Sequence, residues 1–234
     1  MSFYDEDLAR IQASDYGRVA EEAAPGIIRR LKRAGFRGGP VLDLGCGAGP
    51  LARALGRAGY SVSGIEGSRA LARIAKAQAP AAKVSVGNIH TALFPKSVAV
   101  CAVGEVLQYM PAGRAQPSLP RLFDKAYRAL RPDGLILFDL IVEPMVPVAQ
   151  SYQARGDGWE IEIGANQTGP ILRRELVITR GGKTSRETHC QYIYGAAQIA
   201  QWMRQSGFRT DVLDSYGVVP ILPRRKVFMG QKVG

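Results

Sequence analysis

The sequence predicts an α/β fold in which helices cover both faces of a doubly wound, mostly parallel sheet. The first observation is a regular alternation of short apolar runs and amphipathic helical runs between residues 41 and 142. The second is that Val98–Val103 and Leu135–Val142 are almost entirely apolar, as expected of strands buried on both faces. The third is a change after Glu143, where apolar and polar residues alternate and indicate a small antiparallel β insert.

The elements before this change follow one another along the chain. Residues 5–34 are predicted to be helical, with Gly35 as the stop. Five strands are then expected, at Val41–Leu44, Ser61–Ile65, Lys83–Val86, Val98–Val103 and Leu135–Val142. The helices between them are predicted at Pro50–Ala58, Arg69–Ala79 and Leu119–Leu130, the last one stopped by the turn Arg131–Gly134.

The antiparallel segment and the C-terminal part come next. In the insert, strands are predicted at Trp159–Ile163, Ile171–Thr179 and Thr184–Tyr194, with a turn at Gly181-Gly182. A helix at Ala196–Gln205 and two strands at Phe208–Tyr216 and Lys226–Gln231 complete the chain.

Composition limits the classes of protein. With 234 residues and 46% hydrophobic residues, the chain is large enough for one domain with one well-buried core. It has three cysteines, none of them in a CxxC pair, and two histidines, so we expect no disulfide framework and no metal site, and a cytoplasmic location. No segment has the length and apolar character of a membrane span. The net charge of +11 is spread along the chain; a basic protein attracts phosphates, so nucleic acid has to be considered as a partner.

A glycine-rich loop, Asp43-Leu-Gly45-Cys-Gly47-Ala-Gly49, lies where the first strand passes into its helix. Glycines there let a ligand approach the backbone beside a helix N-terminus. Taken alone, this loop could be no more than a tight turn. The spacing Gly47-x-Gly49-x-x-Ala52 also satisfies the dinucleotide-binding pattern, so the hypothesis of an NAD-binding protein stays open at this point.

Four segments in the right order resemble the motifs of class I S-adenosylmethionine (SAM)-dependent methyltransferases. Val41–Gly49 is similar to motif I of that family almost letter for letter, and Ile65-Glu66-Gly67 ends the second strand. Gly87-Asn88-Ile89 follows the third strand, and Gly104-Glu105 follows the fourth. A fifth segment, the turn Arg131–Gly134, resembles the L-x-P-G-G turn of the family, although Asp133 replaces the first of its two glycines.

The resemblance implies a seven-stranded Rossmann-like sheet whose last strand is antiparallel, within a single domain of residues 1–234. Residues 1–34 would form an N-terminal helical cap, 35–142 the cofactor-binding half, 143–195 a substrate-side insert, and 196–234 a helix and β hairpin. It also implies SAM as the cofactor and S-adenosyl-L-homocysteine as the product. The residues expected to contact the cofactor are Asp43, Gly45, Cys46, Gly47, Gly49, Glu66, Gly67, Asn88, Ile89, Gly104 and Glu105.

The acceptor side is expected to form from three segments above the sheet, with a small molecule as the methyl acceptor. In such enzymes methyl transfer is an in-line displacement, and a base is needed only when the nucleophile carries a proton of high pKa. His189 and Tyr194 are the candidates for a catalytic role, although a structural role is also open for His189. The residues expected to contact the acceptor are Tyr4, Tyr16, Gln108, Tyr109, Trp159 and Tyr192.

Two other functions remain open from the sequence. A nucleic-acid methyltransferase is suggested by the net charge and by Arg173-Arg174 and Arg224-Arg225-Lys226. Against it, the fourth strand runs into Gly104-Glu105-Val-Leu and not into the Asn/Asp-Pro-Pro-Tyr signature of base amino-group methylation, so nucleic acid is not the expected acceptor. A non-catalytic SAM-binding protein is the third possibility. The sequence leaves the nucleophile and the oligomeric state open.

Overall fold

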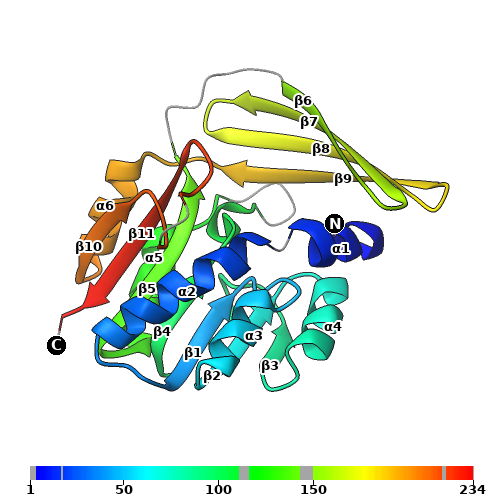
Figure 1. Cartoon of the computed structure of the whole chain (residues 1–234). Coiled ribbons are helices and arrows are strands. Elements are labelled where there is room, and N and C mark those ends of the chain that lie inside the picture. The colour runs from blue at the N-terminus through cyan, green and yellow to red at the C-terminus, as the bar shows by residue number, and fades with distance from the viewer. Residues whose placement is uncertain (1–3, 17, 111–115, 143–149, 218–219, 234) are drawn as a thin grey trace.

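The chain is organised around a seven-stranded sheet (Figure 1). The computed structural model describes residues 4–16, 18–110, 116–142, 150–217 and 220–233. In spatial order the strands are β3 (Lys83–Val86), β2 (Tyr60–Glu66), β1 (Gly39–Leu44), β4 (Ser97–Ala102), β5 (Leu130–Ile141), β11 (Arg225–Lys232) and β10 (Phe208–Leu213). The first five pair in parallel, whereas β11 is antiparallel to both β5 and β10. This confirms the predicted fold class.

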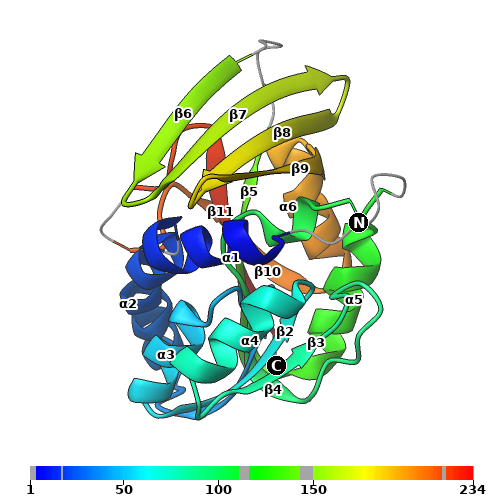
Figure 2. The same cartoon turned by 90° about the vertical axis from the view of Figure 1, so that its right-hand side faces the viewer.

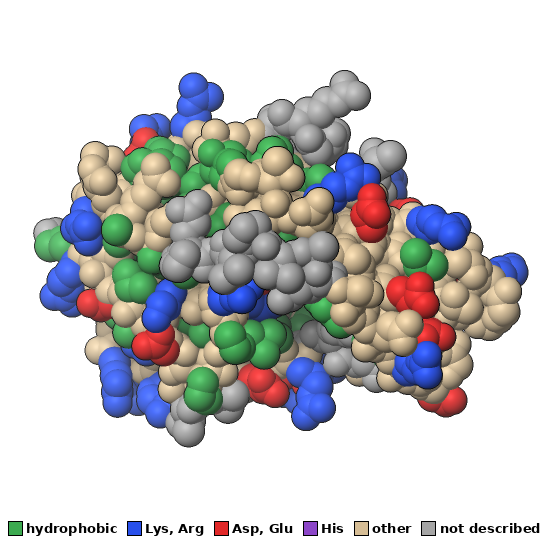
Figure 3. Space-filling view, turned by 90° about the horizontal axis from the view of Figure 1, so that it is seen from above, with side chains coloured by type: hydrophobic (Ala, Val, Ile, Leu, Met, Phe, Trp, Pro, Cys, Tyr) green, Lys and Arg blue, Asp and Glu red, His purple; other side chains and the backbone are tan. Residues whose placement is uncertain are grey.

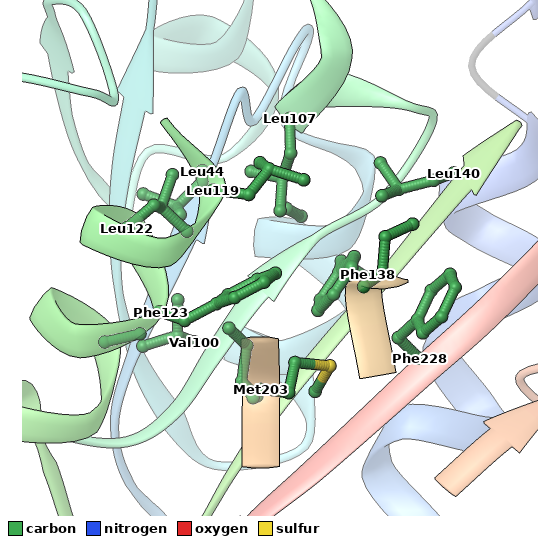
Figure 4. Close-up of a cluster of buried hydrophobic side chains, with 14 of the residues drawn as sticks. Leu44, Val100, Leu107, Leu119, Leu122, Phe123, Phe138, Leu140, Met203 and Phe228 are labelled. Atoms are coloured by element: carbon green, nitrogen blue, oxygen red, sulfur yellow. The ribbon is translucent and has the colours of Figure 1, made fainter. Parts of the chain in front are cut away.

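Helices bury two separate hydrophobic cores, one on each face of the sheet. On one face, α5 (Leu119–Ala129) and α6 (Ala196–Gln205) cover a core in which the Phe138 ring stacks on those of Phe123 and Phe228, with centroids 5.4 and 5.2 Å apart (Figure 4). On the other face, α2 (Arg18–Arg33) and α3 (Pro50–Arg57) pack on β1 and β4. The helix α4 (Arg69–Gln78) lies beside α3. With both faces covered, a ligand can reach the parallel strands only at their ends.

The insert is a second, four-stranded antiparallel sheet above the carboxyl edge of the first (Figures 1 and 2). Its strands, in order, are β6 (Gln150–Gly156), β7 (Trp159–Thr168), β8 (Ile171–Arg180) and β9 (Lys183–Tyr192). Strand β6 was not predicted from the sequence, because its residues show no apolar alternation. The turn Asp157-Gly158 was the available signal: Gly158 has a φ of 72°, a left-handed conformation that favours glycine.

Other boundaries also differ from the prediction: β7 continues past Ile163 to Thr168, β10 ends at Leu213 and not at Tyr216, and two larger differences concern β5 and the N-terminal helix. The turn at Arg131–Gly134 lies inside β5, where the pairing skips from Ser97↔Leu130 to Ala99↔Leu135 and Asp133 adopts a φ of 62°. The predicted N-terminal helix is divided into α1 (Glu6–Ile11), a π-helical turn at Gln12–Tyr16, and α2. At that turn the Ser14 hydroxyl donates to the carbonyls of Arg10 and Ile11, a contact that bends helices.

The helix α1 lies between the two sheets (Figure 2). Its Leu8 and Ile11 pack against Ile161, Leu176 and Ile178 of the insert. Ala9, on another side of the same helix, packs with Ala48 of the glycine loop and Leu71 of α4. Among the described helices, none is long and apolar enough to cross a membrane.

Gln108 attaches the insert to the main sheet. It ends the short 3₁₀ helix η2 (Val106–Gln108) and is fully buried. Its amide nitrogen donates to the carbonyls of Ile141 (2.8 Å) and Tyr192 (3.0 Å), and its amide oxygen accepts from the N–H of Ile141 (2.8 Å). One side chain therefore links the end of β5 to the end of β9.

We predict that Gln108→Ala lowers the free energy of unfolding by about 2–4 kcal/mol, because it leaves three buried backbone groups without partners. Urea unfolding measures this. Gln153→Ala is the matched control, since the Gln153 amide donates to Glu162 on the exposed face of the insert. Equal stability of the two variants would show that Gln108 does not hold the insert in place.

Candidate active site

The glycine loop turns at the carboxyl end of β1, where the strand order reverses between β1 and β4. Gly45, Gly47 and Gly49 all have left-handed backbones, with φ of 61°, 56° and 87°. A Cβ on Gly45 would come within 2.4 Å of the Val106 side chain, so this glycine is needed for packing. A Cβ on Gly47 would meet nothing within 4 Å, so the loop there borders open space in which a ligand can lie.

Glu66, the last residue of β2, holds the glycine loop in place. Its Oε2 accepts the N–H of Gly47 and its Oε1 accepts the N–H of Ser68, both at 2.8 Å. Burial raises the pKa of this carboxyl group, and hydrogen bonds from the N–H groups of Ser68, Gly47 and Gly67 oppose the rise. Each oxygen keeps a second lone pair, so the carboxylate can also accept from a hydroxyl group of a ligand.

Asp43 has a buried oxygen that lacks a partner among the described residues. The side chain is 2% exposed, and its Oδ2 has no hydrogen bond. Burial, with a further contribution from the charge of Glu66, raises the pKa of this carboxyl group to about 8. An unsatisfied buried carboxyl group of this kind suits a cationic ligand.

Cys46, within the same loop, is a packed side chain. It is buried, and a Cβ added to Gly64 would lie 2.7 Å from its sulfur. Burial raises the pKa of the thiol, which keeps it protonated and poorly nucleophilic.

The loop after β3 carries Asn88 and Ile89. The Asn88 side chain is exposed, and its Oδ1 accepts the N–H of His90 at 2.9 Å; Ile89 is buried. The ammonium group of Lys125 on α5 donates to the carbonyls of Ile89, His90 and Ala92 at 2.8–3.1 Å. Lys125 therefore shapes this loop, a role that nothing in its local sequence indicated.

The loop after β4 is held by a carboxylate that the sequence analysis did not identify as a site residue. Asp139 of β5 is fully buried and accepts the N–H groups of Gly104 (2.7 Å) and Glu105 (3.3 Å). The hydroxyl group of Tyr216 donates to the same carboxylate at 2.7 Å. A lone acid within an otherwise apolar strand was the signal that could have revealed it. Glu105, held in this way, has a left-handed φ of 61°.

The buried Glu105 side chain joins three parts of the molecule. Its Oε2 lies 3.3 Å from a guanidinium nitrogen of Arg174 on β8 and accepts from the amide of Gln191 on β9 at 3.0 Å. Its Oε1 pairs with Arg225 of β11. Arg174 also donates to Gln191 at 2.6 Å. Two of the arginines that suggested nucleic-acid binding therefore point inward.

Three rings gather beside this network: Tyr4, Tyr109 and His189. The tyrosine hydroxyl groups are 3.0 Å apart, and the His189 ring lies 5.0 Å from that of Tyr4 and 5.7 Å from that of Tyr109. Burial raises the pKa of both tyrosines. Along β9, Glu187, His189 and Gln191 share the buried face.

His189 is paired with a carboxylate that also binds the N-terminal segment. Its Nε2 lies 2.8 Å from Oε2 of Glu187, and both side chains are buried. Glu187 also accepts the N–H groups of Tyr4 (2.8 Å) and Asp5 (2.9 Å). From the other side, the Ser68 hydroxyl group donates to the Tyr4 carbonyl at 2.7 Å.

The remaining predicted acceptor residues lie elsewhere. The hydroxyl group of Tyr194 donates to the Pro117 carbonyl at 2.7 Å, and its ring packs between those of Tyr192 and Trp202 in the main core. Both amide hydrogens of Gln108 are already used by backbone carbonyls, as described above. Trp159 packs in the cluster beneath the insert. Tyr16 ends the π-helical turn, and its side chain lies outside the described residues.

Two features of the site bear on partners and metals. Within the described part of the chain, no group of three or more His, Cys, Asp or Glu side chains is placed to hold a metal ion. Seen from above, the basic side chains of the described surface are dispersed around the face and interspersed with acidic ones (Figure 3). The described side chains of this face therefore form no continuous basic stripe of the kind typical of a nucleic-acid interface.

Comparison with known proteins places this geometry in context. The profile of the methyltransferase domain family matches residues 16–212. A Geobacillus sp. (strain WCH70) protein whose name gives it as a methyltransferase is 28% identical over 198 residues, which cover 78% of this chain and 79% of that one. The fold is similar to that of a SAM-dependent methyltransferase from Clostridium acetobutylicum (TM-score 0.82, 15% identity, 97% and 98% of the chains covered). It is also similar to an amino pentose methyltransferase from Micromonospora echinaspora solved with SAM bound (TM-score 0.76, 14% identity, 99% and 98% covered).

We predict that Glu105→Gln lowers the free energy of unfolding by about 2–4 kcal/mol, because two largely buried guanidinium groups lose their carboxylate partner. The matched control is Glu175→Gln, which breaks an exposed pair with Arg173 on the outer face of the insert and should cost less than about 1 kcal/mol. Chemical unfolding of both variants gives the comparison. Similar values would mean that the network contributes no more than a surface ion pair.

Proposed function

The chain belongs to the family of SAM-dependent methyltransferases, and we propose that it transfers the methyl group of SAM to a small molecule held beneath the insert. The observation that carries the proposal is the pairing of two sites at one sheet edge. Asp43 and the glycine loop form a site suited to a cationic, backbone-bound ligand. The ring cluster with His189 stands beside it, above the loop that follows β4.

The residues at the sheet edge fit SAM. Asp43 would face its amino group, since the orphaned Oδ2 has no partner in the described chain. Gly45, Gly47 and Gly49 would let it approach the backbone, and Glu66 with Gly67 would bind the ribose hydroxyl groups. Asn88 and Ile89 would contact the adenine. The loop of Gly104 and Glu105, fixed by Asp139, would lie under the methionine end.

The chain supplies position, shielding and a base. When bound, SAM provides a methyl group on a sulfonium, which is already activated for displacement. Tyr4 of the N-terminal segment and Tyr109 of the loop after β4 would wall the acceptor and exclude water, so that its nucleophilic atom is aligned with the methyl group. His189 would accept the proton that the nucleophile loses. Tyr194 has no catalytic role in this proposal, because its hydroxyl group is hydrogen-bonded to the Pro117 carbonyl in the main core.

Small acceptors fit this site better than nucleic acid. The His189 ring is buried, and Arg174 and Arg225 already pair with Glu105, which leaves them poorly placed to bind a phosphate group. One protein of similar fold is an amino pentose methyltransferase, which supports a small polar acceptor. The buried pair of His189 and Glu187 supports a catalytic protein over one that only binds SAM.

We predict that SAM binds more tightly as the pH rises from about 5.5 to 7.5, by up to about tenfold per unit. The pKa of Asp43 is about 8 in the free protein, so this carboxyl group is protonated below that value. Asp43 would lose its proton when it pairs with the cationic ligand. Because binding releases a proton, the affinity for SAM falls as the pH falls. Calorimetry in buffers of different ionisation enthalpy measures both the affinity for SAM and the number of protons released on binding. Asp43→Asn should bind more weakly and without this pH dependence; a wild-type affinity independent of pH would contradict the placement of Asp43.

We predict that His189→Ala lowers turnover by about 10²–10⁴-fold, the usual contribution of a general base, while SAM affinity changes little. Transfer from methyl-labelled SAM would be measured with a panel of aminosugars, hydroxylated sugars and phenols, and with tRNA as the competing acceptor. Thr188→Ala is the matched control, since Thr188 lies on the opposite face of β9. Methylation of tRNA and of none of the small molecules would overturn the proposed acceptor class.

A further inference from the structure

Glu187 of β9 joins the N-terminal segment to His189, and neither the glycine-loop motif nor the family match says what it does. One of its oxygens, Oε2, lies 2.8 Å from both the Tyr4 amide nitrogen and Nε2 of His189. The other, Oε1, accepts the N–H of Asp5 at 2.9 Å. The residues joined are 183 positions apart in the chain, so this contact exists only when the N-terminal segment lies against the insert.

The hydrogen-bond donors around Glu187 determine which ring nitrogen of His189 carries the hydrogen. Two backbone N–H groups can only donate, and both point at Glu187, so its oxygens act as acceptors. A carboxylate that accepts throughout requires Nε2 of His189 to carry the hydrogen in this contact. In the neutral ring, the basic lone pair is then on Nδ1. This assignment follows from the hydrogen-bond partners of the two side chains.

We propose that Glu187 is a positioning residue: it holds His189 in the Nε2–H tautomer, and it does so through a carboxylate whose geometry depends on the docked Tyr4 and Asp5. The inference rests on the proposed function, because it makes Nδ1 the atom that takes the acceptor's proton. In that step the acceptor's lone pair forms the new bond to the methyl carbon, and the electrons of the broken carbon–sulfur bond stay on sulfur. The proton moves to Nδ1, and the imidazolium formed is balanced by the carboxylate of Glu187.

The consequence is that the base is oriented only when the site is covered. If Tyr4 and Asp5 leave, Glu187 loses two of its three donors and is free to rotate away from Nε2. His189 would then lose the partner that selects its tautomer. The same movement would break the contact between Tyr4 and Ser68 beside the glycine loop. Docking of the N-terminal segment would thus cover the cofactor and orient His189 at the same time.

The tautomer can be read directly by NMR, because the chain has two histidines and long-range proton–nitrogen spectra distinguish a protonated ring nitrogen from one with a lone pair. His90→Ala assigns the two rings. In the wild-type protein we expect the neutral His189 ring to be in the Nε2–H form. An Nδ1–H form would overturn the proposal without the need for any variant at Glu187.

The coupling is tested by Glu187→Ala, with Glu175→Ala on the outer face of the insert as the matched control. In Glu187→Ala we expect a mixture of His189 tautomers and at least about tenfold faster hydrogen exchange at the amides of Tyr4 and Asp5; the control should change neither. Faster exchange with an unchanged tautomer would show a purely structural role and overturn the proposal. SAM calorimetry separates the two hypotheses. Absence of SAM binding would contradict the proposed function, whereas the His189 tautomer tests the role of Glu187.

Discussion

The ion pairs of Glu105 are the interaction on which the rest of the site depends. Taking a carboxylate out of water costs several kcal/mol, and here the cost is offset by two guanidinium groups and an amide that come from three different elements. Each partner alone would leave the carboxylate underbonded. The arrangement therefore favours one placement of the insert, of β11 and of the loop after β4, and it keeps Glu105 in a left-handed conformation that costs about 1–3 kcal/mol.

The parts of this protein that were predictable from sequence are those with a local cause. The parallel sheet followed from alternating runs, and the glycine loop followed from positions that need a left-handed backbone. The arrangement of the acceptor side depends instead on contacts between residues that are distant in the sequence. Gln108 looked available for a substrate, but Ile141 and Tyr192, both distant in the sequence, use both of its amide hydrogens. Lys125 and Glu187 gain their roles from partners on other elements, which no local pattern reveals.

Strand β6 and the bulge in β5 show the same limit at the level of backbone structure. A strand at a sheet edge needs one neighbour and little apolar alternation, so β6 is visible only through its turn and its pairing with β7. In β5, the residues Arg131–Gly134 carry the features of a turn, and the chain does make a local irregularity there. The strand continues on both sides because Leu130 and Leu135 are both buried against the core. Tertiary packing overrides the local signal.

The helix α1 is held by contacts to both sides of the site. Six residues cannot form a stable helix by themselves, so α1 depends on contacts to the insert through Leu8 and Ile11 and to the cofactor side through Ala9. Its polar contacts are placed at its start, where Glu187 and Ser68 bind the backbone of Tyr4 from opposite sides. A ligand that contacts both the docked N-terminal segment and the sheet edge would favour the docked state, in which His189 is held by Glu187.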